Sequence, residues 1–231
     1  MERARGGRSQ PARRVRIGPE KHTLTPVLEA DGLTCDRGER RLFSGIDFQL
    51  GEGEWIHVRG PNGCGKTTLL RTVCGLVRPT RGEVRWRGSR IGALGEEFRA
   101  QLCYIGHFDA LQAELTCREN LRFAASLARA TVTAKELSLA LERLGLAACE
   151  ELPTKLLSQG QRRRAALCRL LVSPAPLWIL DEPFNALDSD ALETVRATVA
   201  EHLSRGGRVL LASHRSVTLQ AGLAKVLDLG P

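Results

Sequence analysis

A glycine-rich segment in the first third of the chain has the composition of a phosphate-binding loop. Residues 60–68 read Gly-Pro-Asn-Gly-Cys-Gly-Lys-Thr-Thr and fit the pattern GxxxxGK[ST] in full. Glycines let the backbone curl until several N–H groups point into one concavity, where phosphate oxygens bind. We expect Lys66 to add its charge at the β- and γ-phosphates, and the Thr67 hydroxyl to hold Mg²⁺. The predicted phosphate-site residues are Gly60, Pro61, Asn62, Gly63, Cys64, Gly65, Lys66, Thr67 and Thr68.

Two adjacent carboxylates, Asp181 and Glu182, follow the fully apolar run 177–180. A buried strand that ends in a carboxylate sets a rigid negative group beside the phosphate loop, where Mg²⁺ would bind. Glu182 comes one residue later and is suited to polarise an attacking water. The two motifs together predict a P-loop nucleoside triphosphatase.

Three further segments narrow the family. Leu157-Ser-Gln-Gly-Gln161 resembles the LSGGQ signature of ABC ATPases, with Gln159 where glycine is usual. Asn185-Ala-Leu-Asp188 resembles the D-loop of that family. His214 follows the apolar run 209–212 and matches the family's histidine that contacts the γ-phosphate. The resemblance to an ABC nucleotide-binding domain covers roughly residues 27–230.

The resemblance implies an α/β fold of the P-loop NTPase class. It implies a RecA-like core with a mixed or parallel sheet, an N-terminal antiparallel β-subdomain and an inserted helical subdomain at about 107–172. It also implies that ATP and Mg²⁺ bind, and that two copies stack head to tail. Each ATP would then lie between the phosphate loop of one copy and the signature of the other. The residues assigned to this shared site are Ser158, Gly160, Gln161 and Asp188.

Two departures from the common ABC pattern favour a narrower family. His107 occupies the position of the glutamine that usually precedes the helical subdomain, and it is a candidate for catalysis and for binding the metal. Arg37 occupies the position of the aromatic residue that usually stacks on adenine. A guanidinium can stack on a purine through its flat face. Both substitutions resemble the ABC ATPases of cytochrome c maturation, the CcmA type. Further segments that carry this resemblance are 42–46, 104–107, 119–121 and 177–184.

The narrower resemblance implies a peripheral protein at the cytoplasmic face of the inner membrane. Its partners would be integral membrane subunits of the CcmB and CcmC type, with hydrolysis serving haem export or release of a haem chaperone. The chain has no CxxCH motif, and we expect no direct haem binding and no nucleic-acid partner. Two alternatives stay open: the ATPase of another small exporter, and a soluble ABC ATPase. The soluble class usually has two ATPase halves or a coiled-coil insertion, and this chain shows neither pattern.

Apolar strands separated by helical patterns must position these residues. Such alternation favours a largely parallel sheet with helices on both faces. The expected strands are 27–33, 42–50, 55–58, 83–86, 177–180 and 209–212, and the expected helices are 66–76, 118–130, 134–144, 158–172 and 191–204.

Composition is that of a globular protein, with 42% hydrophobic and 26% charged residues in 231. No apolar run approaches the roughly 20 residues of a membrane-spanning helix, and no secretory signal is apparent. We therefore expect the protein to stay in the compartment where it is made. Of the net charge of +8, residues 1–26 contribute +5, from seven basic and two acidic side chains. We expect a disordered basic tail there; contact with nucleic acid or an anionic membrane, and a transit peptide, are alternatives.

Seven cysteines at irregular spacing form no CxxC pair, which favours reduced thiols. Cys64 lies inside the phosphate loop near Lys66. One hypothesis is that its alkylation blocks hydrolysis and that ATP protects it. The alternative is that Cys64 is only a small residue tolerated in a tight loop.

Overall fold

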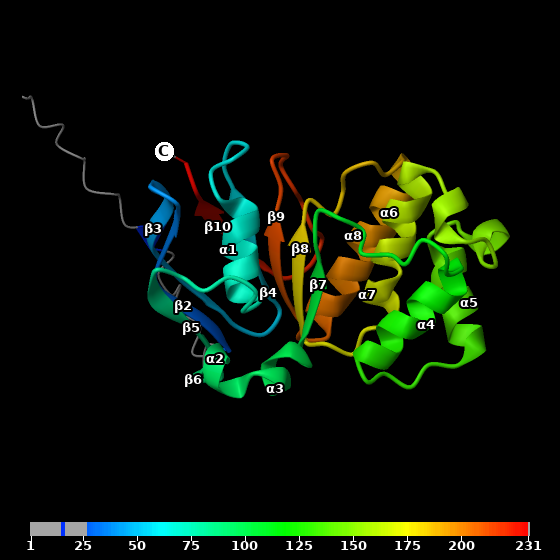
Figure 1. The fold of residues 1–231 in the computed structure, drawn as a ribbon, viewed down its shortest axis with the longest axis horizontal. Helices are drawn as coiled ribbons and strands as arrows, with labels where there is room; N and C mark the ends of the chain where they lie inside the picture. The colour runs from blue at the N-terminus through cyan, green and yellow to red at the C-terminus, as the bar shows by residue number, and fades with distance from the viewer. Residues whose placement is uncertain (1–14, 17–26, 231) are drawn as a thin grey trace, which may run out of the picture.

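The computed structural model describes residues 15–16 and 27–230. Figure 1 shows a layered α/β molecule: an antiparallel sheet lies on one side, a parallel sheet lies in the middle, and most helices cover the opposite side. Helix α1 (Lys66–Val73) lies between the two sheets. Among the described residues, no helix has both the length and the apolar character to cross a membrane.

The parallel sheet has the strand order β10-β4-β9-β8-β7. Its strands alternate between two apolar cores: Leu177 and Ile179 pack toward α1, whereas Trp178 and Leu180 pack toward the helical side. A strand buried on both faces reads as a continuous apolar run, which explains why the sequence revealed β8 and β9. The strands are β4 (Glu54–Arg59), β7 (Leu102–Ile105), β8 (Leu177–Asp181), β9 (Arg208–Ala212) and β10 (Leu223–Asp228). Strand β10 escaped the sequence analysis because most of its residues are exposed and show no regular alternation.

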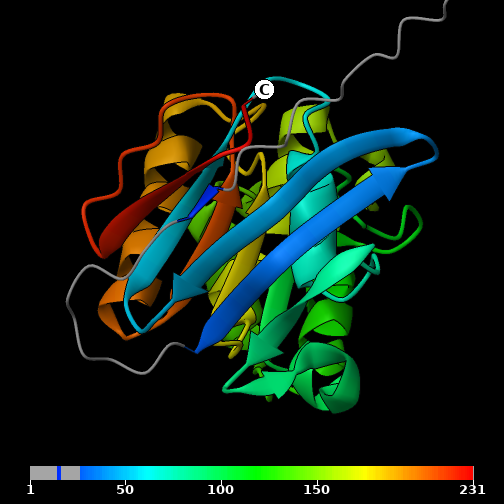
Figure 2. The ribbon, with the colours of Figure 1, turned by 90° about the vertical axis from the view of Figure 1, so that its left-hand side faces the viewer.

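The second sheet has the order β1-β3-β2-β5-β6, and all its pairs are antiparallel except β1 with β3. Figure 2 shows its long strands crossing in front of α1 and the parallel sheet. Its strands are β1 (Val15–Arg16), β2 (Leu28–Arg37), β3 (Arg40–Leu50), β5 (Arg81–Trp86) and β6 (Ser89–Arg90). Of the tail expected at 1–26, only residues 15–16 are described, and they pair with Ile46 and Asp47 instead of leaving the fold. The rest of that expectation lies outside the described residues.

Helices α4 to α8 form the remaining layer, with α2 and α3 beside the antiparallel sheet (Figure 1). Thr116, Thr133 and Ser158 each cap a helix through a reciprocal capping box, which fixes where α4, α5 and α6 begin. The helix expected at 158–172 is two segments. They join at Cys168, where the Leu171 N–H bonds to the Cys168 carbonyl at 3.0 Å and tightens the turn. The helices are α2 (Ile91–Leu94), α3 (Glu96–Arg99), α4 (Cys117–Leu127), α5 (Ala134–Arg143), α6 (Gln159–Leu167), α7 (Arg169–Val172) and α8 (Ser189–Ser204), with short 3-10 turns η1 (Ala147–Cys149) and η2 (Thr154–Leu156).

Candidate active site

The phosphate loop connects β4 to α1 and ends in a left-handed glycine. Gly65 caps α1 with φ of 107°, and a Cβ there would lie 3.1 Å from the Phe43 ring and 3.2 Å from Leu42. Only glycine fits this conformation and this close approach. Lys66 is buried, and its Nζ donates to the carbonyls of Gly60 at 2.7 Å and Pro61 at 3.1 Å. The positive charge of Lys66 therefore lies against the backbone of the phosphate loop itself.

Asp181 ends β8 and is almost fully buried. Its Oδ2 has no hydrogen-bond partner among the described residues. Burial raises the pKa of the Asp181 carboxyl and the neighbouring Glu182 charge adds to the rise, whereas a hydrogen bond from Thr67 and the charges of His107 and Arg71 oppose it. A buried carboxylate oxygen without a partner, beside a threonine hydroxyl, offers the oxygen ligands that Mg²⁺ prefers.

Glu182 has an unusual backbone conformation, with φ of 49°. Such a left-handed conformation costs a non-glycine residue on the order of 1–3 kcal/mol and persists where neighbouring groups hold it. The Glu182 N–H donates to the Ala212 carbonyl at 2.9 Å. Its carboxylate makes three contacts with His214: the backbone N–H of His214 donates to Oε1 at 3.0 Å, and Nδ1 lies 3.1 Å from each of the two carboxylate oxygens.

One cavity of about 510 Å³ brings most predicted residues together. It joins the phosphate loop to the ends of β8 and β9, and Arg37 reaches it from the end of β2. His107, at the position of the usual glutamine, also lines it. The predicted residues in its wall are Arg37, Asn62, Gly63, Gly65, Lys66, Thr67, Thr68, His107, Asp181, Glu182 and His214.

The signature residues do not line this cavity. Ser158 Oγ accepts the Gln161 N–H at 3.2 Å, and Gln161 Oε1 accepts the Ser158 N–H at 2.8 Å, so the pair is a helix cap within this chain. A Cβ on Gly160 would lie 3.2 Å from the Ala186 carbonyl, so the signature packs against the D-loop. Asp188 caps α8 by accepting the Ala191 N–H at 2.9 Å.

The remaining loop residues, Gly60, Pro61 and Cys64, also lie outside the cavity wall. Gly60 and Pro61 hold Lys66 through their carbonyls. The Cys64 Sγ lies 2.7 Å from where a Cβ on Gly60 would be, so the thiol packs under the loop. All seven cysteines are free in the structure, as expected.

Two features escaped the sequence analysis. The first is Arg163, a buried residue of α6 whose guanidinium reaches the backbone of Asp181 and Glu182. The residue looked ordinary because three arginines follow the signature in sequence, and nothing local distinguishes the buried one.

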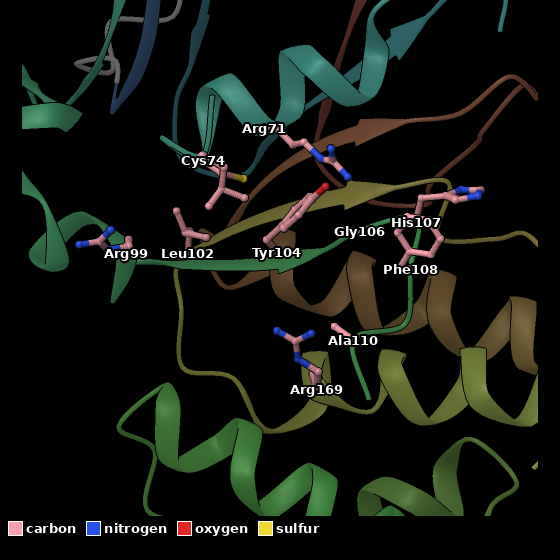
Figure 3. A pocket seen from close by; sticks show the side chains of 11 residues that line it. Arg71, Cys74, Arg99, Leu102, Tyr104, Gly106, His107, Phe108, Ala110 and Arg169 are labelled. Carbon is pink, nitrogen blue, oxygen red and sulfur yellow. The ribbon is translucent and has the colours of Figure 1, made fainter. Parts of the chain in front are cut away.

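The second is a groove beside the site, shown in Figure 3. Two adjoining cavities of about 430 and 300 Å³ share Arg99, Leu102, Ala110 and Arg169 in their walls. Apolar side chains stand exposed along it, Phe108 at 76% and Leu127 at 70%. In the part of the chain that the structure describes, neither Arg99 nor Arg169 forms a salt bridge.

A parallel sheet whose strand ends carry a phosphate loop, a buried aspartate and a Glu–His pair defines a nucleotide-binding ATPase of the P-loop class. The family model described as "ABC transporter" matches residues 43–185. Solved structures agree: a putative ABC transporter ATP-binding protein from Pyrococcus furiosus is 26% identical, with a TM-score of 0.75 over 87% of this chain and 96% of that one. The dimeric structure of a bacterial ABC transporter cassette is 25% identical, with a TM-score of 0.74 over 87% and 94%.

Curated relatives identify the subfamily within the ABC transporter family. The cytochrome c biogenesis ATP-binding export protein CcmA of Dechloromonas aromatica is 50% identical over 88% of this chain and 100% of its own length. The proteins of the same name from Nitrosospira multiformis and Haemophilus influenzae are 44% and 45% identical, over 88% and 82% of this chain and 99% and 90% of their own lengths. The chain therefore belongs to the ABC transporter family and, within it, to the cytochrome c biogenesis ATP-binding export proteins. Both resemblances that the sequence motifs indicated are confirmed.

Proposed function

We propose that this protein is the ATP-hydrolysing subunit of a membrane ABC complex that serves cytochrome c maturation. The observation that carries the proposal is the single cavity lined by Lys66, Asp181, Glu182 and His214. It combines a cationic phosphate cradle with a buried carboxylate and an oriented second carboxylate, which are the groups that phosphoryl transfer to water requires.

Thr67 and Asp181 would hold Mg²⁺, with His107 as a further candidate because it lines the same cavity. Asp181 Oδ2 has no hydrogen-bond partner within the described part of the chain, and this supports the assignment because a buried carboxylate oxygen without a partner is unfavourable. When bound, the metal would neutralise developing charge on the β- and γ-phosphate oxygens. Lys66 would add its charge there once it turns from the loop carbonyls to the phosphates.

Glu182 would accept the proton of the attacking water. His214 holds this carboxylate through its backbone N–H and Nδ1, which limits the orientations of both side chains. A base held in one orientation needs little reorganisation when the proton moves. His214 is 43% exposed at the rim of the site, where it could contact the γ-phosphate.

The signature supports a head-to-tail dimer. Ser158, Gly160 and Gln161 lie outside the cavity that Lys66, Asp181 and Glu182 line, so one chain does not bring all of the predicted contacts to ATP. A second copy would bring the N-terminus of its α6 to the triphosphate and exclude water from it. Asp188, beside the signature, would lie at the boundary between the two copies.

The groove beside the site would receive the membrane partner, an integral subunit of the CcmB or CcmC type. Its walls combine exposed apolar side chains with the guanidinium groups of Arg99 and Arg169 (Figure 3), neither of which forms a salt bridge with another described residue. These features fit an amphipathic helical segment that carries a carboxylate. The complex would lie at the cytoplasmic face of the membrane and use hydrolysis for haem export or for release of a haem chaperone.

The test is made in the source cell with Lys66→Ala and Glu182→Gln. Staining of membrane proteins for covalently attached haem should show loss of c-type cytochromes while the variant still accumulates at the membrane. Unchanged haem attachment would contradict the role in maturation and favour another small exporter. Recovery of the protein with ribosomes instead of membranes would favour a soluble ABC ATPase.

Charge reversal tests the groove. Arg99→Glu with Arg169→Glu should abolish co-purification of the membrane subunits, because both guanidinium groups face the partner. Arg205→Glu, which alters an exposed arginine at the end of α8, is the matched control and should leave co-purification intact. Unchanged co-purification of the double variant would place the partner elsewhere.

A further inference from the structure

Arg163 is a buried arginine that connects three separate segments. It lies on α6, and its residue surface is 5% exposed. Nη2 donates to the carbonyls of Asp181 at 3.0 Å and Glu182 at 2.8 Å. Nη1 donates to the Gly106 carbonyl at 3.0 Å and lies 3.4 Å from Asp109 Oδ1. One guanidinium therefore joins the signature helix, the catalytic strand end and the loop after β7.

Arginine is well suited to bind these backbone and side-chain acceptors at the same time. Burying a guanidinium is unfavourable unless its donors are matched, and its planar fork can serve two directions at once. Most of its partners are backbone carbonyls, so their positions depend on the course of the chain and not on side-chain rotation. A lysine has one point of charge and cannot reach both groups of acceptors in the same way.

The first consequence concerns Glu182. Three bonds hold its left-handed backbone: its N–H donates to the Ala212 carbonyl, and its own carbonyl accepts from Arg163 at 2.8 Å and from the Asn185 N–H at 3.3 Å. This conformation sets the direction of the carboxylate toward His214. Removing Arg163 would leave the Glu182 carbonyl with only the longer bond from the Asn185 N–H. The strained backbone would then be less constrained and could relax toward an ordinary conformation.

The second consequence concerns the loop after β7. His107 and Phe108 lie between the two positions that Arg163 contacts, Gly106 and Asp109. His107 lines the nucleotide cavity, whereas Phe108 stands 76% exposed in the groove. Further along, Asn120 fixes the loop at Gln112. Arg163 thus joins the loop that faces the groove to the backbone of the catalytic carboxylates.

We infer that Arg163 is a positioning residue for ATP hydrolysis: it holds Glu182 in its catalytic conformation and couples this conformation to the 106–109 loop. The inference rests on the proposed hydrolysis at this site. Arg163 does not line the cavity, so nucleotide binding should depend on it far less than the hydrolytic step does.

The experiment compares Arg163→Gln and Arg163→Lys with Arg208→Gln in the full-length protein. Arg208 is also buried, at 4% exposed, and pairs with Glu52 at 2.7 Å, but it lies at the start of β9, away from the site. Both Arg163 variants should lose on the order of 100-fold in kcat while KM for Mg·ATP changes little. Arg208→Gln should lower the Tm and leave kcat of the folded protein unchanged.

Hydrogen exchange supplies a second measurement that does not need activity. In Arg163→Lys, peptides covering 104–111 and 181–186 should lose protection together, although they lie far apart in sequence. In Arg208→Gln they should keep their protection. Unchanged kcat, or a loss of protection in only one of the two segments, would overturn the inference. If the wild-type protein hydrolyses no ATP, the proposed function fails, and the exchange result alone decides the role of Arg163.

Discussion

His214 and Glu182 lie at the ends of neighbouring parallel strands and bind each other through three contacts. The His214 backbone N–H and its Nδ1 both meet the Glu182 carboxylate, at 3.0 and 3.1 Å. Because β8 and β9 pair in register, with Asp181 opposite Ala212, the two residues follow their strands at the same sheet edge. A change in one residue should therefore alter the orientation of the other.

Replacing His214 should slow hydrolysis, because the Glu182 carboxylate would no longer be held by the imidazole. In His214→Ala we expect kcat to fall by on the order of 100-fold, because Glu182 loses its side-chain partner and the γ-phosphate loses a neighbouring imidazole. Arg215→Ala alters the adjacent exposed residue and should retain activity. Steady-state phosphate release from Mg·ATP measures both. A fully active His214→Ala variant would show that the side-chain contact with Glu182 is dispensable.

Asp181→Asn should stabilise the nucleotide-free protein at neutral pH. Burial raises the pKa of Asp181 above its ordinary value, so the folded state disfavours the charged form. The carboxylate therefore lowers stability as pH rises through the raised pKa, and the variant removes this loss. Each 1 kcal/mol would shift the Tm by roughly 2–4 °C in a chain of this size. Thermal melts at neutral and acidic pH should show the gain only at the higher pH.

The same variant should lose the stabilisation that Mg²⁺ adds in the presence of ATP. Ligands that bind the folded state raise the Tm by mass action, and Asp181→Asn removes the proposed metal ligand. Melts with ATP alone and with Mg·ATP separate the two effects. Equal Mg²⁺-dependent stabilisation of variant and wild type would contradict the metal assignment.

Asn120 should contribute strongly to the stability of the helical layer at the start of α4. It is buried, its Oδ1 accepts the Gln112 N–H at 2.7 Å, and its Nδ2 donates to three carbonyls, those of Gln112, Leu115 and Thr116. Asn120→Asp would aim a carboxylate at these carbonyl oxygens and should cost about 2–4 kcal/mol of unfolding free energy. Ser126→Ala on the same helix should cost within about 0.5 kcal/mol. Urea unfolding of both variants gives the comparison.

His202 should make the stability depend on pH. Its ring stacks on Trp178 with centroids 3.8 Å apart, and burial lowers its pKa to about 4. The folded state thus favours neutral imidazole, so this contribution is complete above the ordinary pKa of about 6.5 and is lost as pH falls toward 4. The slope is at most about 1.4 kcal/mol per pH unit.

His202→Phe keeps a stacked ring without a titrating group. The difference in unfolding free energy between wild type and His202→Phe should therefore change with pH between 6.5 and 4, because the other groups cancel in the comparison. Urea unfolding across this range measures it. A difference that is constant with pH would show that His202 titrates alike in the folded and unfolded chains.

The local chemistry of the site could be predicted from sequence. The loop at 60–68 acts through its own backbone, and Asp181 and Glu182 follow a strand whose apolar run identifies it, so both motifs are complete within a few residues. The parallel core followed from the same reasoning, because strands buried on both faces are apolar throughout. Where strands were exposed, as in β10, the pattern was too weak to indicate them.

The relationships between distant segments were decided by the tertiary structure alone. Arg163 contacts Gly106 across 57 positions and Glu182 across 19, and its neighbours Arg162 and Arg164 have the same local chemistry. Which of three consecutive arginines is buried depends on the face of α6 that packs on the sheet. The separation of the signature from the nucleotide cavity depends likewise on how the helical layer packs. Sequence determines the reactive groups, whereas packing decides which of them meet, because hydrogen bonds and burial act through space and not along the chain.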